Sequence, residues 1–185
     1  MRKVLIRAVI AIAITSVYGT MVLAEEVKSG DNFSTVGSTR NFASAPKVHE
    51  YLFAARRGPA ALDRIALHRV TRSPAGSSEY PVILYLPGTW MNGTVAPDNP
   101  RDSLGVSFAA RGIDFWALDY RTHFVPVASA QSDLAELKGW TNALFEVDID
   151  AAVRFIMATT GRRRIAVAGF SRGVSLAYLY AADHP

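Results

Sequence analysis

The chain has 185 residues, of which half are hydrophobic and none is cysteine. This length and composition suit one folded domain with its own core, and the absence of cysteine excludes disulfides and thiolate metal sites. The formal charge is +4, but Arg2, Lys3 and Arg7 supply three of those charges, which leaves +1 for the rest. No basic surface therefore remains that would indicate nucleic-acid binding.

The first 24 residues have the pattern of a signal peptide. Three basic residues precede an apolar run over residues 8–14, small and apolar residues lead to Ala24, and an acidic pair follows. This pattern predicts cleavage after Ala24 and a secreted or periplasmic protein. The alternative is a membrane-anchored protein, because residues 8–24 are nearly long enough to span a bilayer if they stay uncleaved. Polar residues in that stretch favour the signal peptide, and a membrane contact is expected only through it.

The next part of the chain predicts a lead-in followed by strands. Residues 25–45 are rich in Ser, Gly, Asn and Thr without an apolar period, so we expect a flexible segment before a domain over residues 46–185. Residues 48–55 and 65–71 mix apolar and polar positions and predict two early strands. The continuous apolar run 82–86 is typical of a strand buried on both faces of a parallel sheet.

Helices and strands then alternate. Asp102 or Ser103 is a candidate N-cap for a short helix that Gly112 ends. Residues 114–118 predict a strand, and residues 142–160 predict a longer helix because their apolar positions recur at helical spacing. This alternation favours a parallel sheet with helices on both faces.

The motif G-x-S-x-G occurs as GFSRG at residues 169–173. An apolar, strand-like run at 165–168 precedes it, and an apolar, helix-like run at 174–182 follows. Strand, sharp turn and helix form the context in which this motif presents Ser171 as an exposed nucleophile. The alternative is a glycine-rich turn that contains an ordinary serine.

The residues around the serine have roles of their own in such a turn. Gly169 and Gly173 allow a tight, strained backbone and close packing of strand on helix. Arg172 would begin the helix, so its N–H has no partner within the helix and can stabilise a negative oxygen.

These motifs together resemble the α/β-hydrolase superfamily, in its serine esterases and lipases. The matching pieces, in the family's order, are VILYL with LPGTWMNG, then AARGIDFWALDYRTH, then GFSRG. They cover a little over half of the chain, from residue 82 to residue 185. The resemblance implies a three-layer α/β/α fold with a mostly parallel sheet, of which this chain would be the N-terminal part. It also implies an enzyme without metal or cofactor that cleaves a small-molecule or lipid ester.

The resemblance assigns chemistry to particular positions. Ser171 would attack the acyl carbonyl and form an acyl-enzyme, and Arg172 N–H would be one oxyanion donor. The second donor would come from the loop after the strand at 82–86. Pro87 has no N–H, so we predict Thr89, with Trp90 as the alternative.

The acid and base of a catalytic triad are not evident. In this family both follow the serine in sequence, and only Asp183 and His184 do so here. A helix rises about 1.5 Å per residue, so His184 would lie on the order of 20 Å from Ser171. His123 follows a strand end on the functional side of the sheet, but the family gives it no such role. We therefore expect the acid and histidine beyond Pro185, in a domain that is incomplete at its C-terminus.

Three other residues are predicted to be structural. Arg121 is expected to pair with a carboxylate or with carbonyls below the site, and His49 and His68 are expected to be structural or exposed in the early strands. Two alternatives to an esterase remain from the sequence. One is a peptidase or amidase on the same scaffold, and the other is an inactive fragment or a binding module. Nucleotide binding is poorly supported, because neither glycine-rich phosphate motif is present.

Overall fold

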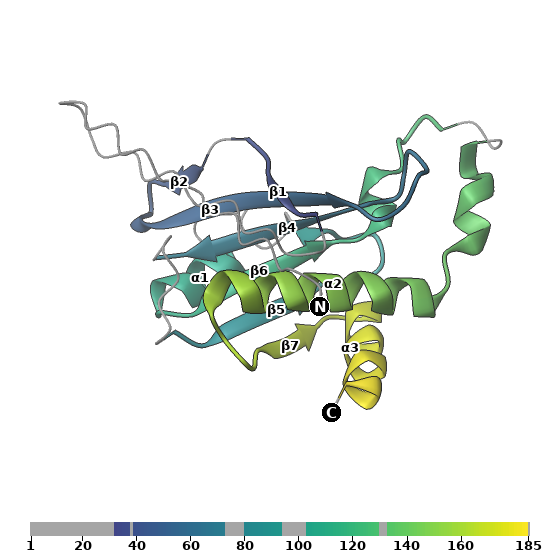
Figure 1. Cartoon of the computed structure of the whole chain (residues 1–185). Coiled ribbons are helices and arrows are strands. Elements are labelled where there is room, and N and C mark those ends of the chain that lie inside the picture. Colours follow the sequence, from purple (N-terminus) through teal and green to yellow (C-terminus); the bar gives the residue numbers. More distant parts are fainter. Residues whose placement is uncertain (1–31, 38, 73–79, 94–102, 130–132, 185) are drawn as a thin grey trace, which may run out of the picture.

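The computed structural model of the protein describes residues 32–37, 39–72, 80–93, 103–129 and 133–184. The predicted signal peptide, residues 1–24, lies outside the described residues, as does the candidate cap Asp102. A central sheet has helices packed on both faces, and α2 runs across the face that Figure 1 presents.

The described residues form a sheet of seven strands in the order β1-β3-β4-β6-β5-β7, with β2 paired to β3. β3 is antiparallel to β4 and β4 is antiparallel to β6, whereas β5 is parallel to both β6 and β7. The strands are β1 Ser34–Thr35, β2 Arg40–Phe42, β3 Ala45–Arg56, β4 Arg64–Thr71, β5 Val82–Leu86, β6 Asp114–Asp119 and β7 Ala166–Gly169.

The prediction of a mostly parallel sheet is correct only for β6, β5 and β7. β3 and β4 are joined by a short connection over residues 57–63. Such a connection can form a hairpin but is too short for the crossover that parallel neighbours need. The early half of the sheet is therefore antiparallel.

Three α-helices cover the sheet, and all three were expected. α1 (Leu104–Ala110) begins at Ser103, whose side chain accepts a hydrogen bond from the N–H of Val106. α2 (Asn142–Thr160) has the predicted bounds, and α3 (Arg172–Asp183) follows the motif. Two 3₁₀ helices, η2 (Arg121–Phe124) and η3 (Asp133–Gly139), lie between β6 and α2.

The three layers follow from alternation along β5 and β6. Leu84, Trp116 and Leu118 pack in one cluster with α2 residues such as Ile149. Their sequence neighbours in the two strands point to the opposite face, where Phe108 of α1 contributes to the cluster. Because successive strand residues alternate between faces, α1 lies on one side of the sheet and α2 on the other.

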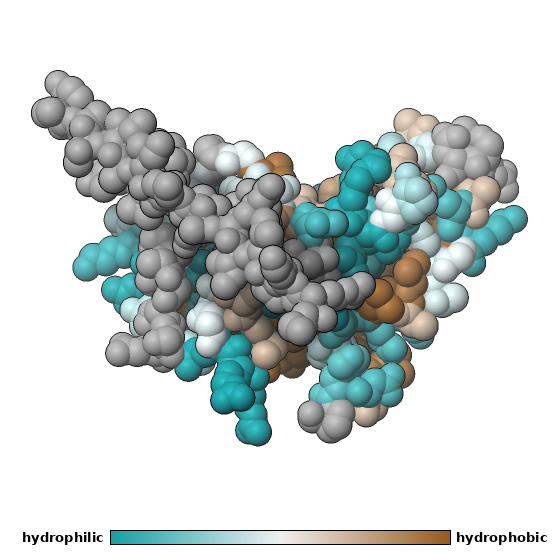
Figure 2. Space-filling model, viewed as in Figure 1, coloured by the Kyte–Doolittle hydropathy of each residue, from teal (hydrophilic) through white to brown (hydrophobic). Residues whose placement is uncertain are grey.

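The side formed by β7 and α3 is more open. Among the described strands, β7 pairs with β5 alone. Figure 2 shows hydrophobic atoms beside hydrophilic ones on α3. The exposed large hydrophobic residues of this part of the chain are Phe170, Val174, Tyr178 and Leu179.

The described part of segment 25–45 differs from the expected flexible lead-in. It contains β1 and β2, which both pair with β3. Phe33 stacks on Phe155 of α2 with ring centroids 4.6 Å apart, and Phe42 is buried with 2% of its surface exposed. The folded domain therefore begins before residue 46. Two isolated aromatic residues make no period, so the pattern gave no sign that they are buried.

Candidate active site

The G-x-S-x-G segment forms a sharp turn between β7 and α3. Ser171 has φ 53° and ψ −121° and is exposed, and α3 begins at the next residue. Positive φ in a residue with a side chain costs about 1–3 kcal/mol. The surrounding hydrogen bonds hold this conformation: Phe170 N–H donates to Leu86 O (3.1 Å), and Val174 N–H donates to Ser171 O (3.0 Å).

The two glycines of the motif are required by close packing. A Cβ on Gly173 would lie 1.9 Å from the carbonyl oxygen of Leu86, at the end of β5. A Cβ on Gly169 would lie 2.4 Å from the backbone of Gly173. No side chain fits at either position without moving backbone, as expected for a turn that packs strand on helix.

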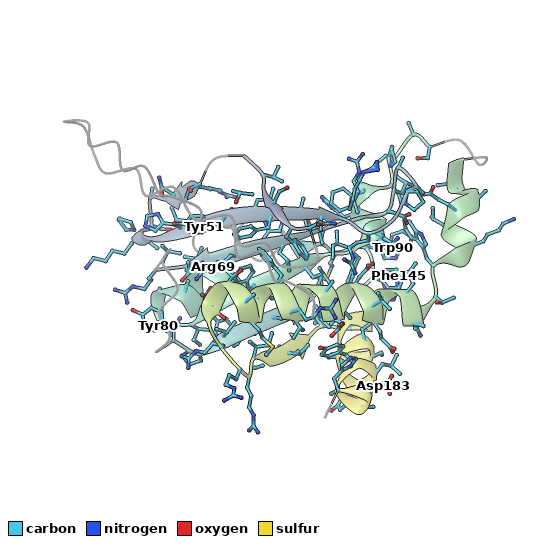
Figure 3. The ribbon with its side chains drawn as sticks, in the orientation of Figure 1. Tyr51, Arg69, Tyr80, Trp90, Phe145 and Asp183 are labelled. Carbon is cyan, nitrogen blue, oxygen red and sulfur yellow. The ribbon has the colours of Figure 1, made fainter. Side chains whose placement is uncertain are left out.

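The loop over residues 87–93 lies against this turn. A Cβ on Gly88 would be 3.1 Å from the Cβ of Ser171, so loop and serine are in contact. The N–H of Met91 donates to Gly88 O (3.1 Å) and closes a turn around Thr89 and Trp90. Trp90 has φ 66° and is fully exposed, and Figure 3 places it at the end of the sheet where the turn lies.

Two backbone segments next to Ser171 can supply N–H groups, namely the start of α3 and the loop at Gly88. Arg172 is the first residue of α3, so its N–H has no partner within the helix. In the loop, Pro87 and Gly88 are buried, whereas Thr89 and Trp90 are exposed inside the turn. Both remain candidates for the second donor.

The start of the loop rests on an aromatic side chain of the neighbouring strand end. The hydroxyl of Tyr120 donates to Pro87 O (3.2 Å). Burial raises the pKa of Tyr120, although the nearby Arg172 acts in the opposite direction, so the hydroxyl keeps its proton. The Arg172 guanidinium lies 4.4 Å from the centre of the Phe145 ring. This side chain is thus turned toward α2, to which Phe145 belongs.

Arg121 pairs with carboxylates, as predicted. It is buried, with 2% of its surface exposed. Its Nε lies 2.6 Å from Asp148 Oδ2 and its Nη2 lies 3.0 Å from Asp148 Oδ1. Its Nη1 also donates to Asp63. The residue joins the β3–β4 connection to α2 beneath the site and is therefore structural.

A cluster of buried polar side chains contacts the other end of the loop, at Gly93. His68 Nδ1 is 2.6 Å from Glu50 Oε1, and His68 Nε2 is 3.0 Å from Asp119 Oδ2. The other oxygen of Asp119 accepts the N–H of Gly93 (2.6 Å), the last described residue of the loop. Burial by itself lowers the pKa of His68, but Asp119 and Glu50 outweigh it and raise this pKa to about 9. We call these three residues the Glu–His–Asp cluster.

No protein-family model matches the sequence, and no curated protein matches it significantly. Solved structures do match. A protein from Sulfolobus solfataricus, provisionally named a lipase, has a TM-score of 0.73 and 27% identity over 82% of this chain and 46% of its own. The chain has the α/β-hydrolase fold.

Two further structures support this assignment at lower identity. A cold-adapted esterase from an Arctic intertidal metagenomic library has a TM-score of 0.57 and 21% identity, over 82% of this chain and 61% of its own. A glucuronoyl esterase from Solibacter usitatus has a TM-score of 0.54 and 16% identity, over 83% of this chain and 49% of its own. The chain thus spans about half of the length of the structures that it matches.

The histidines of this α/β-hydrolase are all described, and none makes a hydrogen bond to the Ser171 hydroxyl. Each of the four has other partners: Asn41 for His49, Glu50 and Asp119 for His68, Asn92 for His123, and the Tyr180 carbonyl for His184. Asp183 and His184 end α3, as expected. The described residues therefore bring together the serine, its glycines and the loop, but no histidine base.

The Glu–His–Asp cluster is the part of the site that sequence reasoning missed. It treated His68 as an ordinary strand histidine and assigned no role to Glu50. The available signal was a histidine inside a strand whose other positions are largely apolar, since a polar residue buried there needs partners. Among the described residues, no group of three or more His, Asp or Glu side chains is arranged to hold a metal ion.

Proposed function

We propose that this α/β-hydrolase cleaves a carboxylic ester through an acyl-enzyme on Ser171. The observation that carries the proposal is the strained backbone of Ser171, at φ 53°, in contact with the loop at Gly88. Strain of this kind is kept where the surrounding structure needs a side chain in one place. The names of the similar structures, a lipase and two esterases, favour an ester over an amide.

The reaction would proceed in two steps. Ser171 Oγ attacks the carbonyl carbon while a general base takes its proton, and the carbonyl oxygen becomes an oxyanion held by the N–H groups of Arg172 and Thr89. The intermediate collapses, the alcohol leaves with the proton, and the acyl group remains on Ser171. Water then attacks the acyl carbon, the acid leaves, and the serine regains its proton.

This mechanism needs a histidine held by a carboxylate. His49, His68, His123 and His184 are engaged elsewhere. The proposal therefore assigns the base to none of the described histidines.

Export and substrate belong to the same proposal. The pattern of residues 1–24 supports a secreted or periplasmic enzyme that meets small-molecule or lipid esters outside the cytoplasm. None of the described helices is both long and apolar enough to cross a membrane.

A fluorophosphonate probe tests the nucleophile. We expect labelling at Ser171, its loss in Ser171→Ala, and its retention in Ser175→Ala, where the matched serine lies on the exposed part of α3. Hydrolysis of p-nitrophenyl acyl esters, but not of the matching anilides, would separate esterase from amidase. Equal labelling of wild type and Ser171→Ala would refute the assignment.

A further inference from the structure

The Glu–His–Asp cluster crosses three neighbouring strands diagonally. In the register of the sheet, His68 of β4 lies opposite Leu52 of β3 and Ala117 of β6. Glu50 lies two residues before Leu52 and Asp119 lies two residues after Ala117, at the diagonal positions on the same face. The side chains of all three are nearly fully buried.

The charges that face this cluster fix the state of His68. Both ring nitrogens lie within hydrogen-bond distance of a carboxylate oxygen, and an ionised carboxylate can only accept. Both nitrogens therefore donate, which requires the imidazolium form. Arg40 of β2 lies 3.4 Å from the second oxygen of Glu50, and His123 Nε2 of η2 lies 3.7 Å from Asp119 Oδ2.

The cluster ends on the loop that contacts Ser171. Asp119 Oδ1 accepts the N–H of Gly93. A Cβ on Gly93 would lie 2.8 Å from His68 Cδ2 and 3.0 Å from the carbonyl oxygen of Ala117. The backbone of the loop is thus packed directly on the histidine ring. Its other end, at Gly88, is packed on Ser171, and the candidate oxyanion donors lie between these two contacts.

We propose that Glu50, His68 and Asp119 are positioning residues that hold the loop over residues 87–93 in the conformation that presents its N–H groups to the oxyanion at Ser171. The proposal rests on the function proposed above, since it assigns these residues to the same reaction. None of them contacts the reacting atoms. They act through the backbone of Gly93, and a loop donor displaced by a fraction of an ångström loses much of its effect on the transition state.

Protonation of His68 is part of this arrangement. A neutral imidazole has one N–H, so it can donate to Glu50 or to Asp119 but not to both. Loss of the proton therefore removes the hydrogen bond from His68 to one of the two carboxylates, which weakens the support that the cluster gives to Asp119 and Gly93. With a pKa of about 9, the cluster is intact at neutral pH and loosens in alkaline solution.

Two substitutions separate positioning from general stability. His68→Gln removes the charge and one of the two hydrogen bonds. Glu50→Gln keeps the size of the side chain but removes one of the carboxylates that stabilise the imidazolium, so the pKa of His68 falls. His49→Gln is the matched control, because His49 lies on β3 next to Glu50 but its ring bonds to Asn41 at the surface.

The first measurement needs no catalysis. Amide hydrogen exchange followed by NMR reports whether Gly93 N–H is held. We expect exchange at Gly93 to be roughly tenfold or more faster in His68→Gln than in wild type at pH 7, and unchanged in His49→Gln. In wild type, exchange at Gly93, corrected for the intrinsic effect of pH, should accelerate as the pH passes about 9.

The second measurement uses ester hydrolysis by the full gene product. We expect kcat to fall about 10- to 100-fold in His68→Gln while KM changes less than about threefold. In wild type kcat should fall as pH rises through about 9, and in Glu50→Gln this fall should begin at lower pH. A structural role alone would leave the pH profile of the folded enzyme unmoved.

The outcomes are distinct. Absence of ester hydrolysis in wild type refutes the proposed function, while the exchange experiment still decides whether the cluster holds the loop. If the exchange rate of the Gly93 amide is unchanged in His68→Gln and in Glu50→Gln, the inference is overturned. It is also overturned if this exchange is faster in the variants while their kcat and the pH dependence of kcat match those of wild type. If His68→Gln fails to fold, Glu50→Gln alone decides through its pH profile.

Discussion

The free energy of unfolding should fall as pH rises from neutral to alkaline values, with His68 as a main cause. The pKa of this residue is about 9 in the folded protein, against an ordinary value of 6.5. Between these two pH values, the folded state holds a proton that the unfolded state has lost. Raising the pH therefore favours unfolding. The contribution is fully present below pH 6.5 and is lost as the pH passes 9.

The size of the effect follows from the two pKa values. The two values differ by about 2.5, and one pKa unit corresponds to about 1.36 kcal/mol. Protonation of His68 therefore adds on the order of 3 kcal/mol to the free energy of unfolding at pH 6, and this contribution is absent at pH 10. For a domain of this length, that is a substantial part of a total stability of roughly 5–15 kcal/mol.

Urea unfolding at several pH values between 6 and 10 measures this contribution. Tyrosines and lysines also titrate in this range, so the quantity of interest is the difference between wild type and His68→Gln. That difference should shrink by about 3 kcal/mol from pH 6 to pH 10. His49→Gln should follow wild type throughout. A difference that stays constant with pH would show that His68 is not protonated in the folded state, and the reasoning would fail.

Three other substitutions test separate parts of the structure. Gly173→Ala should lower the free energy of unfolding, measured in urea, by about 3 kcal/mol or more, because the new methyl group would overlap the Leu86 carbonyl. The control is Gly139→Ala, which has open space around it and should change this free energy by less than about 0.5 kcal/mol. Arg121→Gln should cost about 3–5 kcal/mol, because it leaves Asp148 charged and buried; a loss under 1 kcal/mol would contradict this. Ser171→Gly should have a free energy of unfolding about 1 kcal/mol higher than that of Ser171→Ala, because glycine adopts φ 53° without strain. Equal urea midpoints for the two variants would argue against strain at this position.

Local patterns predicted the elements that have strong local signals. α2 has the predicted bounds because an apolar helical period runs unbroken to Gly161, which ends the helix with φ 68°. β5 has its predicted bounds because its apolar run stops at Pro87. The sharp turn at Ser171 was predicted from the motif and its flanking strand and helix. Each of these features is determined by residues close together in sequence.

The features that were missed depend on contacts between distant segments. The pairing of β1 and β2 with β3 is supported by Phe33 and Phe42, which pack against elements far along the chain. The antiparallel half of the sheet depended on the shortness of the β3–β4 connection. The Glu–His–Asp cluster joins residues 18 and 51 positions apart. Periodicity cannot pair such residues, since it reports only on which face of its own strand each one lies.

The site joins two kinds of preorganisation that fail in different ways. The turn at Ser171 is held by backbone packing of Gly173 on the end of β5, and no titratable group takes part in that contact. The loop over residues 87–93 is held by hydrogen bonds from Tyr120 and to Asp119, and the second of these depends on the charge of His68. Alkaline pH should therefore weaken the loop before it affects the turn. A serine that stays exposed and strained while its oxyanion donors move would still bind a substrate, so the loss should appear in kcat rather than in KM.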